Sequence, residues 1–550
     1  MKSRFAKPAI AGSALCALAA AGGSPRHAPP PHLAVLVVVD QLRADLLDRY
    51  DTLFTGGFRR LRDRGFRFTE ARVDHAITIS HPGHVTIATG DEPARHGIVD
   101  AAFYELDHGQ WRFTDALADS TEHILGAPGE PGVSPRKILV SALPDWFVAG
   151  DSSSRVVAVG AGRYSSLLHG GKGHPDVYWY SAPAGRFVTS SYYRARTPSW
   201  LDTFNAERLP TFIRESLDWE TSVPAAARAL ARRDSAPYEG AYGLTAFPHR
   251  ITDALTPEHA RMAAYQARWF ANTPMLDAAT LDLAATAVRA RALGQRDAVD
   301  YLSIVVSQVD DIGHFYGPRS QEQLDNLLRL DRELGAFFAF LDRIVGRNGW
   351  TVAVTADHGT PDIPEYQLET GRHAYRVPQA EVDTILAHVR ALVARDRGTR
   401  EAVAEDVATL LERDSIVADA MTPAELLART PARDSFVVLY RHNYRADRVP
   451  RYPLFSFDSG TSPVAAAGVA VRLRDGDMLD IDRAVHGSPY DFDRRVPIVF
   501  MGPGITPGTS PGRARTIDVA PTLAALAGVP VPPDRDGRVL HRADGEPLRR

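Results

Sequence analysis

Carboxylates and imidazoles recur in this sequence at positions that could hold divalent metal ions. One aspartate precedes a histidine by four residues, another is followed directly by a histidine, and two further residues of these types stand alone. These residues are Asp310, His314, Asp357, His358, Asp40 and His486. Oxygen and imidazole ligands without sulfur suit Zn²⁺, with Mn²⁺ and Co²⁺ less favoured. A single pair is weak evidence, because capping and ion pairing explain most of them, but several pairs near strand ends form a stronger pattern.

A hydroxyl group, that of Ser80, lies in the stretch 75–97, where a strand-like approach should turn into a helix. Pro82 suits the first turn of a helix. We expect Ser80 to cap that helix and to face its positive end, which favours anions. Our hypothesis is that Ser80 is a metal-activated nucleophile that attacks phosphorus. The competing interpretation is an ordinary N-cap serine, and Thr78 is a competing hydroxyl.

Apolar, valine-rich runs predict strands that are buried on both faces. They span 33–39, 301–309, 351–356 and 496–501. Asp40, Asp310 and Asp357 directly follow the first three runs. In open α/β sheets, ligands bind outside the carboxyl ends of the strands. We therefore expect the three acids to converge on one crevice.

Amphipathic helices alternate with these strands. The clearest spans 320–346, where Ser320 and Gln323 form a capping box, an apolar stripe follows the helical period, and a glycine ends the pattern. Shorter helices are expected at 58–65 and 516–526. This alternation predicts an α/β fold with a largely parallel central sheet and helices on both faces.

The N-terminus has the layout of a secretory signal: a basic head, an apolar run at 9–21 and small residues at a cleavage site. We predict a signal peptide at 1–23, a Pro-rich linker at 24–32 and a catalytic domain at 33–550. Two insertions, at about 163–296 and 361–483, should cover the active site. The protein would be secreted or periplasmic with no membrane span in the mature chain; the alternative is a retained N-terminal anchor.

Charge and cysteine content exclude some classes of partner and site. The net charge of −4 in 550 residues gives no basic surplus, so a nucleic-acid partner is not indicated. Cys16 is the only cysteine and lies in the signal segment. The mature chain should therefore contain neither disulfides nor thiolate metal sites.

The combined motifs resemble the alkaline phosphatase superfamily, in particular its phosphate-irrepressible (PafA-type) branch, with the nucleotide pyrophosphatase/phosphodiesterases as relatives. The matching segments are Val39-Asp40-Gln41-Leu42-Arg43, Ser80-x-Pro82-Gly83-His84, Thr89-Gly90, His96-Gly97-Ile98, Asp310-x-x-Gly313-His314-x-x-Gly317-Pro318, Thr355-Ala356-Asp357-His358-Gly359 and His486-Gly487. The resemblance covers nearly everything after residue 30.

The resemblance implies two Zn²⁺ ions per chain. One would be held by Asp40, Ser80, Asp357 and His358, and the other by Asp310, His314 and His486. Two such ions about 4 Å apart clamp the attacking and leaving oxygens of an in-line displacement. Ser80 would then form a covalent phosphoserine that is hydrolysed in a second step.

The sequence departs from the family where the phosphoryl oxygens should be bound. The asparagine position reads as Ala101, and the Lys-x-Arg position reads as Ala161-Gly162-Arg163, so only Arg163 remains. Arg163 would be a second catalytic residue, or else a solvated surface arginine. Each missing charge-assisted contact could cost about 1.5–3 kcal/mol, which is about tenfold to more than a hundredfold in rate.

We therefore expect a two-zinc hydrolase that acts on small-molecule phosphate monoesters, in the manner of an alkaline phosphatase. A phosphodiesterase or nucleotide pyrophosphatase is the first alternative, and a low-turnover metal-binding protein is the second. A sulfatase is a third, because Ser80-x-Pro82 matches the start of the sulfatase signature. That signature continues with Ser-Arg, whereas Gly83-His84 follows here.

Overall fold

An eleven-stranded sheet forms the centre of the computed structural model, which describes residues 30–173, 176–395, 398–451 and 468–549. In spatial order the strands are β20 (Gly508–Arg515), β2 (Phe66–Arg72), β19 (Ile498–Met501), β13 (Trp350–Thr355), β1 (Leu33–Val39), β12 (Asp300–Val306), β7 (Val156–Gly160), β8 (Asp176–Ser181), β9 (Arg186–Ser190), β5 (Ala118–Leu125) and β6 (Pro131–Val133).

The middle of this sheet is parallel. β13, β1, β12, β7 and β8 run in one direction, whereas β19 and β9 pair antiparallel at either side of them. Val39 of β1 pairs with Val306 of β12, and Val38 pairs with Thr355 of β13. The three strands therefore end level with one another. The prediction of an α/β fold with a largely parallel sheet is confirmed.

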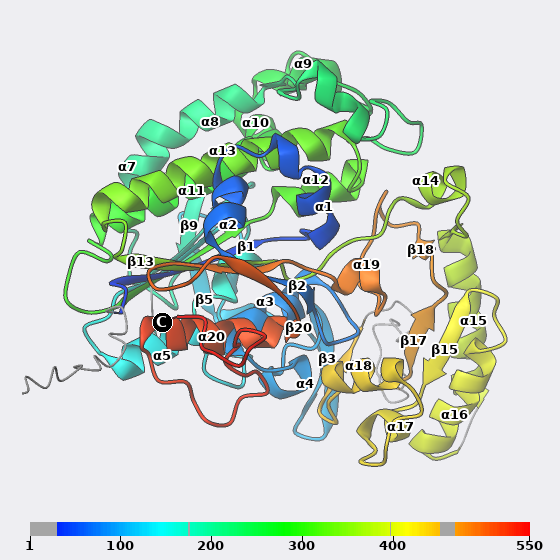
Figure 1. Ribbon diagram of the computed structural model, residues 1–550. Coiled ribbons are helices and arrows are strands. Elements are labelled where there is room, and N and C mark those ends of the chain that lie inside the picture. Colours follow the sequence, from blue (N-terminus) through cyan, green and yellow to red (C-terminus); the bar gives the residue numbers. More distant parts are fainter. Residues whose placement is uncertain (1–29, 174–175, 396–397, 452–467, 550) are drawn as a thin grey trace, which may run out of the picture.

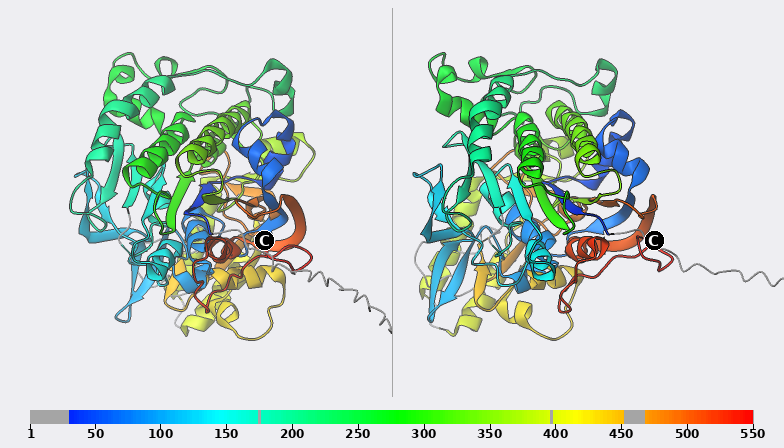
Figure 2. Two further views of the ribbon diagram at one scale, coloured as in Figure 1. Left: turned by 60° about the vertical axis from the view of Figure 1, so that its left-hand side comes forward. Right: turned by 90° about the vertical axis from the view of Figure 1, so that its left-hand side faces the viewer.

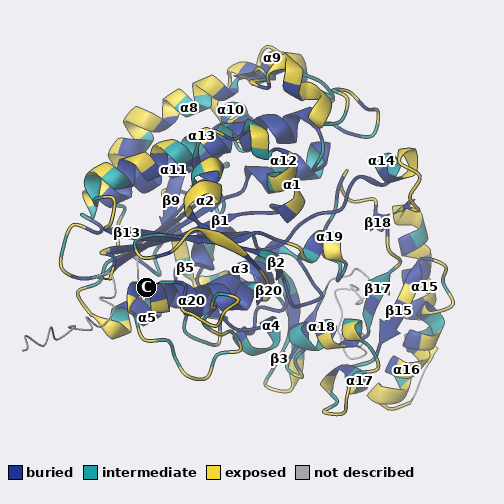
Figure 3. Cartoon of the chain, in the orientation of Figure 1, coloured by how far each residue is buried: buried dark blue, intermediate teal, exposed yellow. Residues whose placement is uncertain are grey.

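β1 is buried on both faces, as its unbroken apolar sequence predicts. Alternate residues of a strand point to opposite sides. Leu33, Val35 and Val37 pack into the core that contains α11 (Met275–Ala290) and α13 (Gln321–Ile344). Their neighbours along β1 pack with α5 (Leu143–Gly150) and α20 (Val519–Ala527). Figure 1 shows helices on both sides of the sheet, and Figure 3 shows its middle strands, such as β1 and β13, as buried.

Most of the predicted elements are present. The strand at 33–39 is found at those residues, and α13 begins after Ser320, whose hydroxyl accepts a hydrogen bond of 3.0 Å from the Gln323 N–H. The helix predicted at 58–65 is α2 (Gly57–Arg64), and that at 516–526 is α20 preceded by a short 3-10 turn.

Two local predictions are wrong. The run at 301–309 is not one strand, because β12 ends at Val306 and the chain enters α12 (Gln308–Tyr316). Val309 is apolar because it is buried as a helix residue, so Asp310 lies in the first turn of a helix and not directly after a strand. Ser80 is the first residue of α3 (Ser80–Thr89); the N-cap is Ile79, so Ser80 caps nothing.

The regions 163–296 and 361–483, which were expected to be insertions, differ in how they pack: part of the first joins the central sheet, and the second has an apolar core of its own. β8 and β9, which fall within 163–296, belong to the central sheet, and the following helices α8 (Leu209–Ser216) and α10 (Ala263–Phe270) lie outside α11 and α13. Within 361–483, α15 (Gln379–Arg395), α16 (Arg400–Leu411), β15 (Val417–Met421) and β17 (Ala470–Leu473) share an apolar core of their own. Figures 1 and 2 show this group beside the sheet.

The predicted signal peptide at 1–23 lies outside the described residues, as does most of the linker at 24–32. In the described part of the chain, no helix is both long enough and apolar enough to cross a membrane.

The packing of α13 on the sheet gives a first prediction. Leu334 is fully buried in α13, so Leu334→Ala should lower the free energy of unfolding by about 2–5 kcal/mol. The matched control is Leu368→Ala, because Leu368 is 56% exposed and should change stability by less than about 0.5 kcal/mol. Chemical denaturation followed by circular dichroism measures both. Equal losses in the two variants would contradict the described packing.

Candidate active site

The carboxyl ends of the parallel strands bring distant polar residues together. Asp40 follows β1, Asp357 and His358 follow β13, and Asp310 and His314 lie in α12, which follows β12. Ser80 begins α3, and His486 lies in the loop before α19 (Asp491–Arg494). The structure brings these seven predicted side chains into one cluster.

One half of the cluster is built around Asp310. The Nε2 atom of His314 lies 3.3 Å from Asp310 Oδ1, and the Nε2 atom of His486 lies 3.4 Å from the same oxygen. His314 follows Asp310 by four residues, which places both on one face of α12. This is the group expected to hold one of the two metal ions.

The other half is built around His358. Its Nε2 atom lies 3.5 Å from Asp40 Oδ1, 3.3 Å from Asp357 Oδ2 and 3.3 Å from Ser80 Oγ. The rings of His358 and His486 are stacked with centroids 3.8 Å apart, so the two halves adjoin. Asp40, Asp357 and His358 are completely buried.

His84 also belongs to the cluster, although it was not predicted to be a ligand. Its Nε2 atom lies 3.5 Å from Asp40 Oδ2 and 3.6 Å from Asp357 Oδ2, and its Nδ1 atom lies 3.2 Å from His169 Nε2. His84 follows Ser80 by four residues on α3, and residues at that spacing share a helix face. That spacing is the signal that could have placed His84 beside the nucleophile.

Backbone carbonyls orient three of the imidazoles. The Nδ1 atoms of His314, His358 and His486 lie 2.7, 2.9 and 2.9 Å from the carbonyl oxygens of Ala484, Gly359 and Thr78 respectively. A carbonyl oxygen only accepts, so each Nδ1 donates its proton. The lone pair of each neutral ring is then on Nε2, the atom that faces the carboxylates, and this arrangement is common among metal-binding histidines.

Gln41 supports the site and was missed as a functional residue. Its side-chain N–H donates a hydrogen bond of 2.6 Å to Asp310 Oδ1, and its backbone N–H donates one of 3.2 Å to Asp357 Oδ1. Its φ of 64° is in the left-handed region, which is costly for a residue other than glycine. No feature of the sequence signals this conformation.

Burial dominates the ionisation of the carboxylates. It raises the pKa of Asp40 well above its usual range, and the carboxylates of Asp357 and Asp310 raise it further. Burial also raises the pKa of Asp357. The pKa of Asp310 is well below its usual range, because contact with His314 and His486 outweighs burial.

The imidazoles divide into two kinds. Burial lowers the pKa of His84 to about 4 and holds the pKa of His358 well below its usual range, so both rings are neutral near pH 7. For His314, burial is outweighed by the contact with Asp310, and its pKa is raised to about 9. A neutral imidazole is the form that binds a metal ion.

The donor set fits divalent metal ions. Both carboxylate oxygens of Asp40, Asp357 Oδ2 and His84 Nε2 are buried and accept or donate no hydrogen bond among the described residues. Buried polar atoms without partners are costly, and oxygen with imidazole nitrogen is the ligand chemistry of Zn²⁺. A cation at this position would satisfy these atoms.

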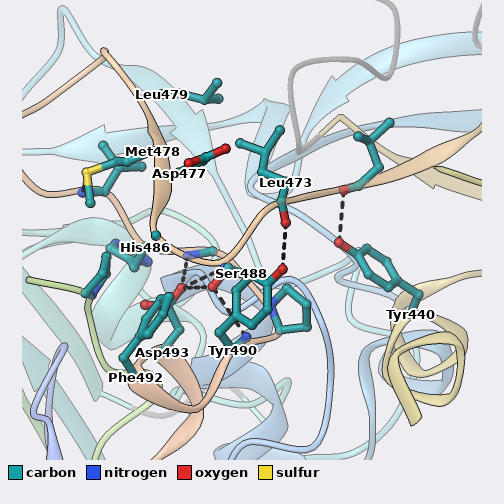
Figure 4. A pocket seen from close by; sticks show the side chains of 16 residues that line it. Tyr440, Leu473, Asp477, Met478, Leu479, His486, Ser488, Tyr490, Phe492 and Asp493 are labelled. Atoms are coloured by element: carbon teal, nitrogen blue, oxygen red, sulfur yellow. Dashed lines mark hydrogen bonds between the residues drawn. The ribbon is translucent and has the colours of Figure 1, made fainter. Parts of the chain in front are cut away.

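A carboxylate behind the site fixes the loop that carries His486. Asp493 Oδ2 accepts hydrogen bonds of 3.1 Å from the Gly487 N–H, 2.8 Å from the Ser488 N–H and 2.6 Å from the Ser488 hydroxyl (Figure 4). Asp493 and His486 line a small pocket together with Tyr490, whose hydroxyl donates to the Leu473 carbonyl. No motif in the sequence indicated this network.

The residues at the expected phosphoryl-binding positions offer few polar groups. Ala101 and Ala161 carry no polar side chain, and Arg163 begins α6 (Arg163–Leu167). The guanidinium of Arg163 lies 3.5 Å from Asp115 Oδ2, and the side chain is 41% exposed. Next to it in the chain, Tyr164 lies against His81 and His84, with ring centroids 5.2 and 6.1 Å apart.

The profile of the type I phosphodiesterase / nucleotide pyrophosphatase family matches residues 34–451. The chain belongs to this family. It is similar to alkaline phosphatase PhoV of Synechococcus elongatus, with 28% identity over 527 residues that cover 94% of this chain and 93% of PhoV. It is also similar to alkaline phosphatase PafA of Elizabethkingia meningoseptica, with 27% identity over 548 residues that cover 94% and 95%.

Solved structures show the same fold. The crystal structure of wild-type PafA superposes with a TM-score of 0.81 at 24% identity, over 93% of this chain and 98% of PafA. A PafA variant superposes with a TM-score of 0.80 at 25% identity over the same shares; in it a threonine is changed to serine, and an asparagine, a lysine and an arginine are changed to alanine. The family match and the full-length similarity to PhoV and PafA together make the chain an alkaline phosphatase-type hydrolase of the phosphodiesterase/pyrophosphatase superfamily.

The support that Gln41 gives to Asp310 can be tested at Gly313. A Cβ added at Gly313 would lie 2.0 Å from Gln41 Oε1, so Gly313→Ala should displace the Gln41 side chain and break its bond to Asp310. We expect hydrolysis of phosphate esters to fall about 10- to 100-fold while the thermal midpoint changes little. Gly129→Ala is the control, because a Cβ there meets nothing within 4 Å. Equal activity in the two variants would contradict this role of Gln41.

Proposed function

We propose that this protein hydrolyses small-molecule phosphate monoesters in a zinc-dependent reaction that proceeds through a phosphoserine at Ser80. The observation that carries the proposal is the position of Ser80. Its hydroxyl oxygen lies 3.3 Å from His358 Nε2. The same cluster contains the buried carboxylates of Asp40, Asp310 and Asp357 and the imidazoles of His314 and His486. A hydroxyl in such surroundings is typical of a nucleophile activated by metal ions.

We propose two Zn²⁺ ions per chain, with the ligands divided as in the two halves of the cluster. Asp40, Ser80, Asp357 and His358 would hold one ion, and Asp310, His314 and His486 would hold the other. The chemistry supplied by such a pair is Lewis-acid stabilisation of the serine alkoxide and of the leaving oxygen.

The protein's own residues position the reacting groups. The partial positive charge at the N-terminus of α3 would favour a phosphoryl group in front of Ser80. In the first step the Ser80 Oγ–P bond forms and the bond from phosphorus to the leaving oxygen breaks. In the second step water attacks phosphorus, the Oγ–P bond breaks and Ser80 is regenerated.

Phosphoryl binding in this chain would rely on Arg163 alone among the expected side chains. Asp115 contacts the Arg163 guanidinium at 3.5 Å and competes with substrate for it. The PafA variant with alanine in place of an asparagine, a lysine and an arginine adopts the same fold as this chain. Loss of such side chains is therefore compatible with the fold.

A phosphodiesterase is the second candidate, because Ala101 and Ala161 leave a phosphate monoester with fewer side-chain donors at the expected phosphoryl-binding positions. A monoester dianion presents more charged oxygens than a diester does, and each needs a donor or a positive charge. Rates on an aryl phosphate and on a bis-aryl phosphate separate the two candidates. A tenfold preference for the monoester supports the phosphatase, and a tenfold preference for the diester supports the phosphodiesterase.

The pattern of the N-terminal residues indicates the compartment in which the protein acts. We propose that 1–23 is a signal peptide that exports the protein to the periplasm or the medium. The basic head, the apolar run and the small residues before 24 support this proposal.

Replacement of the nucleophile tests the proposed mechanism. Ser80→Ala removes the oxygen that bonds to phosphorus, so kcat should fall on the order of 10³-fold or more. Acid quenching of the wild type with ³²P-labelled substrate should trap label on Ser80, and the alanine variant should trap none. Ser80→Thr keeps a hydroxyl and should retain both label and turnover. Label trapped on another residue, or turnover unaffected by Ser80→Ala, would overturn the mechanism.

Restoring the missing phosphoryl ligands tests the basis of specificity. The double variant Ala101→Asn, Ala161→Lys adds one neutral donor and one positive charge, and kcat/KM for an aryl phosphate should rise about tenfold to more than a hundredfold. The rate on a bis-aryl phosphate should change much less. The control is the double variant Ala101→Ser, Ala161→Met. It enlarges the side chains at the same two positions but adds neither the amide of asparagine nor the positive charge of lysine. Equal gains on both ester classes would contradict the assignment of these positions.

A further inference from the structure

Building on the proposed hydrolysis of phosphate esters at Ser80, we propose that the Tyr164 hydroxyl donates a hydrogen bond to a phosphoryl oxygen of the bound substrate. Tyr164 is the second residue of α6, which packs against α3, the helix that Ser80 begins. It would supply a donor in a chain where Ala101 and Ala161 stand at the expected asparagine and lysine positions. Tyr164 would thus be a substrate-contacting residue of this site.

The Tyr164 ring covers the first turn of α3. Its centroid lies 5.2 Å from that of the His81 ring and 6.1 Å from that of the His84 ring, at interplanar angles of 31° and 27°. His81 directly follows Ser80 in the chain, and His84 Nε2 lies 3.5 Å from Asp40 Oδ2. This packing places Tyr164 beside the turn that carries the nucleophile and next to a member of the carboxylate cluster.

The small residues before Tyr164 make room for its ring. A Cβ added at Gly162 would lie 3.3 Å from Tyr164 Cε1, so the ring lies close over the Gly162 backbone. Ala161, which is buried, comes directly before this glycine, at the position where the resemblance places the lysine. The aromatic ring therefore lies next to the position that lost its phosphoryl-binding side chain.

The Tyr164 hydroxyl is available to a ligand. It forms no hydrogen bond with any group in the described part of the chain, and the residue is partly exposed. Burial raises the pKa of Tyr164 well above its usual range, and the carboxylates of Asp40, Asp311 and Asp310 raise this pKa further. The hydroxyl therefore keeps its proton near pH 7 and is close to the carboxylate cluster, where the phosphoryl group would bind.

Arg163 is less well placed for this contact than Tyr164. Its guanidinium lies 3.5 Å from Asp115 Oδ2, so a phosphoryl oxygen must compete with a carboxylate for it. The Tyr164 hydroxyl has no such competitor among the described residues. A hydroxyl that donates to a charged oxygen forms a charge-assisted hydrogen bond. Tyr164 would thus replace a lost donor without restoring the positive charge of the lysine.

Removal of the hydroxyl alone tests this contact. Tyr164→Phe keeps the ring and loses the donor, so kcat/KM for an aryl phosphate should fall about tenfold to more than a hundredfold. The matched control is Tyr375→Phe, which removes a hydroxyl that donates to Glu381 at 2.8 Å in the region 361–483 and should leave kcat/KM unchanged. The thermal midpoint and the zinc content of both variants should equal those of the wild type.

Two results of this experiment would overturn the proposal. One is equal kcat/KM in the wild type and Tyr164→Phe. The other is a fall in kcat/KM that accompanies a loss of zinc, because Tyr164 would then support the metal cluster and not contact the substrate.

Binding of inorganic phosphate separates this contact from the chemistry at Ser80. Calorimetric titration of the zinc-loaded proteins measures the dissociation constant of phosphate without turnover. This constant should rise about tenfold to more than a hundredfold in Tyr164→Phe and stay unchanged in Tyr375→Phe. An unchanged constant in Tyr164→Phe overturns the proposal even if label is trapped on Ser80. A raised constant supports it even if label is trapped elsewhere.

Discussion

The repulsion among buried carboxylates is the constraint on which the active site depends. Asp40 and Asp357 are completely buried, Asp310 is nearly so, and all three lie within one cluster. Asp310 accepts a hydrogen bond from Gln41 and lies beside His314 and His486, whereas both oxygens of Asp40 lack hydrogen-bond partners among the described residues. Burying such charges costs several kcal/mol per group unless opposite charge lies beside them. Bound cations would therefore stabilise the cluster in its ionised form, and the buried unpartnered oxygens of Asp40 and Asp357 are atoms that could receive them.

The order and register of the strands bring these acids together. β1, β12 and β13 are parallel neighbours whose last residues lie at the same level. Each strand is buried on both sides, so a slip in register would expose apolar residues, and this fixes the positions of the strand ends. The ends of β1 and β13 and the helices α3 and α12 thus hold most of the cluster, while a loop supplies His486. Such a division suits a site that needs fixed metal ligands and an adaptable substrate pocket.

Much of this arrangement could be predicted from the sequence, since it follows from local patterns. Unbroken valine-rich runs followed by aspartate placed Asp40 and Asp357 correctly, and the helix at 320–346 was evident from its cap and its period. The errors arose where tertiary contacts decide the outcome. Val309 extended an apolar run although it belongs to a helix, and the left-handed backbone of Gln41 has no sequence signal. His84 could have been found from its spacing to Ser80, whereas Asp493 becomes visible only once the His486 loop is folded.

The most direct test of the account is a crystal structure of the protein grown with Zn²⁺ and measured at the zinc absorption edge. The account predicts two anomalous peaks about 4 Å apart beside Ser80. One should lie within bonding distance of Asp40, Asp357, His358 and the Ser80 hydroxyl. The other should be bonded to Asp310, His314 and His486. A map with no peak in this cluster, or with a single peak that leaves Ser80 out of reach, would contradict it.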